Sequence, residues 1–137
     1  MLPSGFKIRF EGAKRAVAFN DAHWEVMQSI KESARAQIEV AMKAYCDRGP
    51  QDLPPQRFKF QFQYEHSGKM SRIEEFKARH VRFYGACASL GGRPVFLVTG
   101  ADAAKKTDAA DQKILKAAGK LAHSLIHEGN GATPKRK

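Results

Sequence analysis

Residues 75–84 carry the pattern that most constrains the fold of this chain, because their apolar side chains change register. They fall on even positions up to Ala78 and on odd positions from Val81 onward. Since side chains alternate between the two faces of a strand, one straight strand would bury only half of them. A bulge or a tight turn at Arg79 and His80 restores one continuous buried face. The pattern therefore predicts two short β segments that meet at these two residues.

That irregularity has a consequence for the polar residues of the segment. We expect five of them to point away from the core and to share one surface: Lys77, Arg79, His80, Arg82 and Tyr84. Each of them alone is more often a solvated or structural residue. Together they supply what RNA cleavage needs, which is proton transfer at the ribose 2′-hydroxyl and at the 5′-oxygen, and positive charge around the phosphorus. His80 or Lys77 would transfer the proton, and arginine suits bidentate contact with phosphate.

Two amphipathic helices are predicted on either side of this segment. In residues 22–47 apolar side chains recur every three or four positions, which places them on one stripe. Asn20 or Asp21 can cap this helix, and a Gly-Pro pair ends it. A break within residues 29–33 is compatible with the pattern. Residues 109–127 repeat the pattern and form the closing helix.

The remaining periodic segments indicate strands. Residues 6–19 indicate a hairpin that turns at residues 11–14, and the apolar run 95–99 indicates a central strand. Residues 57–64 alternate strictly between aromatic and polar side chains, as in a half-buried strand. This aromatic row could stack nucleobases, or it could pack into the core.

The sequence has a large excess of positive charge. The 24 Lys and Arg residues outnumber the 14 Asp and Glu residues, which gives a net charge of +10. A field of this sign attracts polyanions such as nucleic acid, the ribosome or an acidic protein. Charge alone fixes no partner, so a merely basic protein remains an alternative.

Several classes of protein are disfavoured by what the sequence lacks. The two cysteines, Cys46 and Cys87, are far apart and show no metal-ligand spacing. No phosphate-binding loop, dinucleotide fingerprint or serine-nucleophile motif occurs, and the carboxylates show no metal-site spacing. Neither a metal nor another cofactor is therefore expected. No segment reaches the roughly 18 apolar residues of a membrane span, and the N-terminus has no secretory pattern, so we expect a cytoplasmic protein without a membrane partner.

Four short motifs resemble one family. They are Glu75-Phe76-Lys77, then Val81-Arg82-Phe83-Tyr84, then the apolar run from Pro94 to Val98, and then Lys105-Lys106-Thr107 before a helix. In this order they resemble the phage-derived, HigB-like branch of the RelE/ParE toxin superfamily. The likeness covers about residues 6–127, and its recognisable motifs lie in residues 75–107.

The resemblance implies an α+β fold, in which N-terminal helices pack on a small twisted, mainly antiparallel β-sheet and a C-terminal helix closes the chain. It implies one RelE-like toxin domain over residues 1–131, followed by a short, basic, disordered tail at residues 132–137. It further implies a type II toxin that cleaves mRNA in the ribosomal A site without a metal. A cognate antitoxin protein would neutralise it.

By position in the family motifs, Lys77 and Arg82 match basic residues of the concave face, and Lys105 and Lys106 match the lysine pair at its rim. The expected catalytic residues are Lys77, His80, Arg82 and Tyr84. The expected RNA and phosphate contacts are Arg79, Lys105, Lys106, Lys69 and Arg72. Replacing Arg82 with alanine should then relieve toxicity without unfolding the domain.

Two other functions fit the same sequence. ParE-like relatives inhibit DNA gyrase and cleave nothing, so gyrase is an alternative target for the same fold. A non-catalytic, basic nucleic-acid-binding module is the other alternative, supported by the charge and by the aromatic row.

Overall fold

The computed structural model describes residues 2–103 and 111–127, which form an α+β fold of six strands and three α-helices. In chain order the elements are β1 (Phe6–Glu11), β2 (Ala16–Asn20), α1 (Asp21–Ser29), α2 (Glu32–Arg48), the short 3-10 helix η1 (Pro50–Asp52), β3 (Phe58–His66), β4 (Lys69–Ala78), β5 (Val81–Leu90), β6 (Arg93–Asp102) and α3 (Gln112–His127).

The six strands join in one sheet in the order β1-β2-β6-β5-β4-β3. Neighbouring strands pair antiparallel, except for β2 and β6, which run parallel. The expected mainly antiparallel sheet is therefore confirmed. Because β6, the last described strand, lies beside β2, strands from the two ends of the described chain meet inside the sheet, while β1 and β3 lie at its edges.

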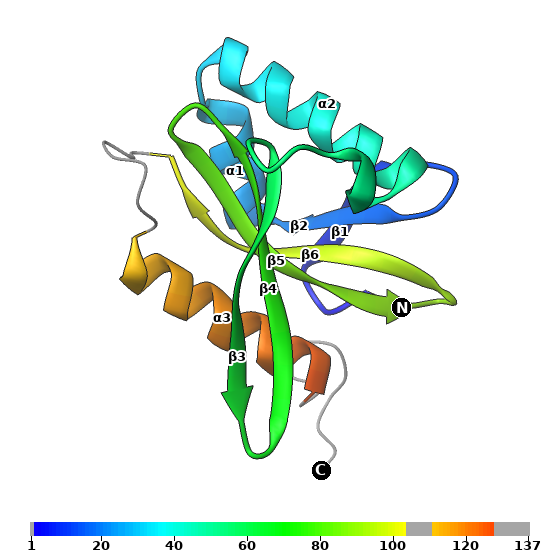
Figure 1. The fold of residues 1–137 in the computed structure, drawn as a ribbon, viewed down its shortest axis with the longest axis vertical. Coiled ribbons are helices and arrows are strands. Elements are labelled where there is room, and N and C mark those ends of the chain that lie inside the picture. The colour runs from blue at the N-terminus through cyan, green and yellow to red at the C-terminus, as the bar shows by residue number, and fades with distance from the viewer. Residues whose placement is uncertain (1, 104–110, 128–137) are drawn as a thin grey trace.

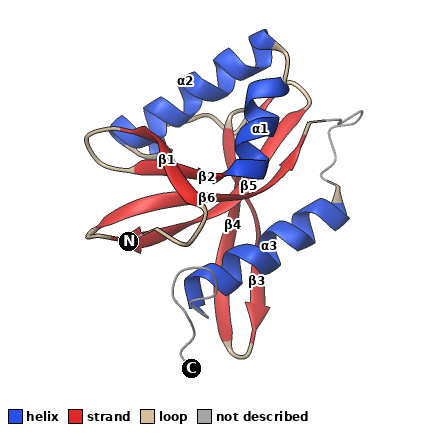
Figure 2. Cartoon of the chain, turned by 180° about the vertical axis from the view of Figure 1, so that it is seen from behind, coloured by secondary structure: helices blue, strands red, loops and turns tan. Residues whose placement is uncertain are grey.

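Helices cover both faces of the sheet (Figures 1 and 2). α1 and α2 lie on one face and share the largest core with it, around Met27, Ile38 and Phe96. α3 crosses the other face and packs Leu115 and Ala118 there. The N-terminal helices thus pack on the sheet as expected, and the closing helix lies on the opposite side of it.

The signals at the helix ends are local, and the structure uses them. Asn20 caps α1, because its Oδ1 accepts a hydrogen bond of 2.8 Å from the His23 amide. The long predicted helix breaks after Ser29, within the expected interval, where Ile30 takes an extended conformation. α2 ends where Gly49 adopts φ +99°, a conformation that favours glycine.

The aromatic row of β3 divides between two cores. A bulge between Phe60 and Phe62 shifts the register of β3 against β4. Phe58 therefore packs in the core beneath α2, whereas Phe62 and Tyr64 pack with residues of α3. The packing interpretation of the row holds for these three residues. Phe60 is the exception and stays 40% exposed.

The irregularity expected at Arg79 and His80 is a tight two-residue turn. β4 ends at Ala78 and β5 begins at Val81, and these two residues lie opposite each other in the hairpin. Arg79 takes φ +56°, which lets the chain reverse within two residues. The change of the apolar side chains from even to odd positions in the sequence therefore marks a hairpin.

Candidate functional site

The register of β4 with β5 brings candidate residues of the hairpin together. Lys77 lies opposite Arg82, and Glu75 lies opposite Tyr84. Directly opposite residues and alternate residues along a strand share a face of the sheet, so these four side chains lie on one face. It is the face that α3 covers, because Tyr84 packs with residues of α3.

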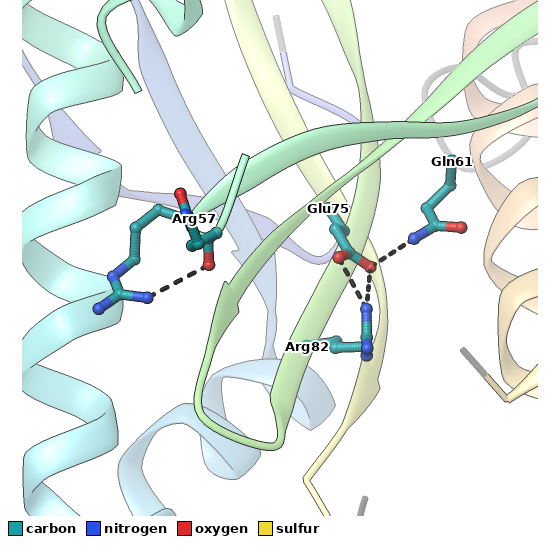
Figure 3. A network of polar contacts seen from close by, with 5 residues as sticks. Arg57, Gln61, Glu75 and Arg82 are labelled. Atoms are coloured by element: carbon teal, nitrogen blue, oxygen red, sulfur yellow. Dashed lines mark hydrogen bonds and ion pairs between the residues drawn. The ribbon is translucent and has the colours of Figure 1, made fainter. Parts of the chain in front are cut away.

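Arg82 forms a buried ion pair with Glu75 (Figure 3). Its Nη1 donates to both carboxylate oxygens, at 2.8 Å to Oε2 and 3.0 Å to Oε1. Gln61 donates a further hydrogen bond from Nε2 to Oε1, at 2.8 Å. The Arg82 and Glu75 side chains are 1% and 0% exposed. The charge of Arg82 is thus compensated inside the protein, and a phosphate could reach it only by displacing Glu75 and opening the packing around it.

Tyr84 is buried beside this ion pair. It shares a core with Ile73 of β4 and Leu115 of α3, and its hydroxyl has no hydrogen-bond partner among the described residues. Burial, and after it the negative charge of Glu75, raise the pKa of Tyr84 above its usual value. The hydroxyl is therefore a neutral proton donor at physiological pH.

The expectation that all five polar residues of the segment face solvent is wrong for Arg82 and Tyr84. The hairpin places both on one face with Lys77, but α3 packs over Tyr84, and Arg82 is buried in its ion pair with Glu75. Arg79 and His80 occupy the turn and are exposed, and Lys77 is half-buried. The sequence shows where the apolar side chains change from even to odd positions, but it does not reveal which face of the hairpin the closing helix covers.

An exposed cation that sequence analysis missed joins this end of the sheet. Lys59 of β3 lies opposite Glu75 and is exposed. With the accessible residues of the hairpin it forms what we call the basic rim: Lys59, Lys77, Arg79 and His80. In the sequence Lys59 is one polar residue of an alternating strand, and only the pairing of β3 with β4 brings it near the hairpin. No local motif marks it.

Two of the expected phosphate contacts do not lie at the basic rim. Lys69 is at the far end of β4 from Lys77, roughly 26 Å along the strand. Arg72 belongs to the opposite face of β4, where it pairs with Glu74 at 3.1 Å and lies over the Phe60 ring, 4.2 Å from the ring centroid. The structure therefore separates these cations from the hairpin site.

Charge is unevenly distributed over the two helical layers. Residues 21–52, which hold α1, α2 and η1, contain four of the 24 Lys and Arg and six of the 14 Asp and Glu, a net charge of −2, so the rest of the chain carries +12. On the other side of the sheet, α3 has no Asp or Glu and has three exposed lysines whose spacing puts them on one helix face: Lys113, Lys116 and Lys120. The lysines of the family motif, Lys105 and Lys106, and the tail at residues 132–137 lie outside the described residues.

Comparisons of this chain with protein-family models, with curated proteins and with solved structures find no match. Within the described residues, no helix is long and apolar enough to cross a membrane. A functional interpretation therefore depends on the basic rim, on the buried cluster behind it and on the sequence motifs that resemble the RelE/HigB family.

Proposed function

We propose that this chain is a metal-independent endoribonuclease of the RelE/HigB type that cleaves mRNA on the ribosome. The observation that carries the proposal is the basic rim, where four accessible residues that can bind phosphate or move a proton lie together at one end of the sheet. Arg82 and Tyr84 lie behind it, on the same face as Lys77. The α+β class and the mainly antiparallel sheet also support it, because the resemblance implies both.

The residues of the rim divide by their chemistry. His80 is the proton-transfer group, since imidazole exchanges protons near neutral pH. Arg79 contacts a phosphate bidentately, and the two lysines add positive charge. In the reaction the ribose 2′-oxygen loses its proton and bonds to phosphorus, while the bond from phosphorus to the 5′-oxygen breaks and that oxygen gains a proton. The products are a 2′,3′-cyclic phosphate and a 5′-hydroxyl end.

Arg82 acts as a positioning residue in this proposal, because it is buried and paired. Its ion pair with Glu75 ties β5 to β4 close behind the turn. The hairpin that presents Arg79 and His80 is thereby held in one conformation.

A reconstituted translation assay tests the proposal. The purified chain is added to ribosomes that translate a defined mRNA, and the cut sites and end groups are mapped. We expect cuts within codons that leave 5′-hydroxyl ends, and growth arrest when the chain is expressed in cells. His80→Ala and Lys77→Ala should each lower the cleavage rate by about 100-fold or more.

The matched control is Arg72→Ala, which removes an exposed cation on the opposite face of β4. It should cleave like the wild-type chain. Intact mRNA in the presence of wild-type protein that binds the ribosomes would refute the proposal.

The resemblance also leads us to propose a protein antitoxin as the partner. A short neighbouring gene is expected to encode an acidic or helix-turn-helix protein. Its product should bind this chain and relieve the growth arrest on co-expression. Continued arrest in the presence of the bound neighbour product would contradict the pairing.

A non-catalytic RNA-binding module is the second candidate, and one observation favours it. Arg82, one of the expected catalytic residues, forms an ion pair with Glu75 and is buried. The surface charges outside the α1–α2 layer would then bind RNA by phosphate contacts alone. Such binding weakens steeply with salt, by about one power of the salt concentration for each phosphate contacted. No RNA is cut at any protein concentration in this case.

A further inference from the structure

Val40 on α2 is the most exposed large apolar side chain of the described residues, at 71%. Residues four positions apart form a ridge on a helix surface. The ridge through Val40 consists of Glu32, Ala36, Val40, Ala44 and Arg48. Its centre is apolar, its alanines are small, and its two ends carry opposite charges.

Open hollows lie on both sides of Val40. One, of about 440 Å³, lies between α2 and the segment after it and is lined by Ala44, Leu53 and Pro54 among others. The other, of about 520 Å³, lies between Val40 and Phe10 of β1. A single exposed valine is ordinary on a protein surface, but a raised apolar side chain between two hollows has the shape that a second helix can pack against.

We propose that this face of α2 packs against the same face of a second copy of the chain, to form a twofold-symmetric dimer. The ridges of the two helices would run alongside each other, as in the commonest class of helix packing, with a crossing angle of about −50°. A twofold axis near Val40 sets each position before Val40 beside the equally distant position after it in the second copy.

The sequence of α2 is complementary to itself about this axis. Ala44 is only 8% exposed and lies in the lining of the first hollow, so the exposed Ala36 of the second copy would enter that hollow beside it. Glu32 meets the Arg48 of the second copy, and the symmetry forms this ion pair twice. No position of the ridge meets a like charge. A partner with one sign of charge would leave one end of the ridge unmatched, which is why the second copy is the occupant that fits.

The intramolecular contact of Arg48 does not oppose this arrangement. Its Nε lies 3.1 Å from Asp52 Oδ2 in an exposed pair, which contributes little to stability and is easily shared. A contact made by one helix and its flanking loops is smaller than a standard protein interface, so we expect a weak dimer whose population rises with concentration. The proposal does not depend on the proposed ribonuclease function.

Sedimentation velocity of the purified full chain, from low micromolar to millimolar concentration, tests the dimer. The wild-type sedimentation coefficient should rise with concentration, and Val40→Glu should stay monomeric throughout. The matched control is Met70→Glu on β4, where a side chain that is 55% exposed lies away from α2, and its association should equal that of the wild type. A wild-type chain that is monomeric at every concentration, or a Val40→Glu variant that associates equally well, overturns the proposal.

A charge exchange tests the register. Glu32→Arg and Arg48→Glu each set like charges side by side in the dimer and should weaken association about tenfold or more. The double variant E32R/R48E restores opposite charges and should return association toward the wild-type value. A double variant that associates as weakly as the single variants overturns the antiparallel register. Circular dichroism of each variant checks that these exposed substitutions leave the fold intact.

Discussion

Arg82→Ala should destabilise the fold strongly, because it leaves the Glu75 carboxylate buried without its counter-ion. In the structure the Arg82 guanidinium donates to both oxygens of that carboxylate, and neither side chain is more than 1% exposed. After the substitution Gln61 is the remaining described side chain that donates to Glu75. Removing one partner of such a pair costs about 3–5 kcal/mol. That is a large part of the roughly 5–15 kcal/mol that stabilises an ordinary domain.

Urea unfolding measured by circular dichroism gives the magnitude. With a slope of about 2 kcal/mol per molar, typical for a chain of this size, the midpoint should fall by roughly 2 M. Arg79→Ala is the matched control, because Arg79 is exposed in the turn, and its free energy of unfolding should change by no more than about 0.5 kcal/mol. The double variant E75Q/R82M removes both charges and should recover most of the loss.

A midpoint for Arg82→Ala that matches that of Arg79→Ala would refute this reasoning. It would mean that the ion pair is solvated and that the guanidinium is accessible to phosphate. The expected result instead changes how toxicity assays are interpreted. A loss of toxicity in Arg82→Ala would then also reflect a destabilised fold, contrary to what the sequence alone suggests, so the exposed His80 is the better residue for testing catalysis.

Three other sites give definite expectations. Gly85→Ala would push a Cβ into the carbonyl oxygen of Leu97 on β6 and should cost about 3 kcal/mol in thermal unfolding; unchanged stability would contradict the close approach of β5 and β6. Burial lowers the pKa of His23, so the folded chain holds its neutral form and loses stability as the pH falls below about 6.5. His23→Gln should flatten this part of the pH profile of urea unfolding, and an unchanged slope would speak against it. Burial raises the pKa of Cys46 to about 11, so a thiol reagent at about pH 8 should modify it only after denaturation; rapid labelling of Cys46 in the native chain would disprove this.

The turn at Arg79 and His80 and the start of α1 could be predicted because their causes are local. Two-residue periodicity shows where the buried face changes, and an asparagine before an amphipathic segment shows where a helix begins. The length of β6 was not predictable in this way. It extends to Asp102, past the apolar run 95–99, because its later residues pair with β5, and Asp102 lies opposite Arg82.

The candidate site was predictable only in part, because its accessibility is decided by distant segments. The sequence groups Lys77, Arg82 and Tyr84 by strand periodicity, and the register of the hairpin confirms this grouping. The sequence does not show that Glu75 would form an ion pair with Arg82, nor that α3 would cover Tyr84. Lys59 was not predicted as a site residue for the same reason, because its position depends on pairing between strands and not on its neighbours in sequence.

The parallel pairing of β2 with β6 has a consequence for how the chain is made. β2 is synthesised early, and its buried residues Val17 and Phe19 lie beside Phe96 and Val98, which follow much later. Until β6 has emerged from the ribosome, β2 pairs with β1 alone. The core beneath α1 and α2 then lacks the β6 residues Phe96 and Val98. Sheets closed by such remote contacts form slowly. We therefore expect the nascent chain to expose the apolar side chains of this core until β6 has been translated.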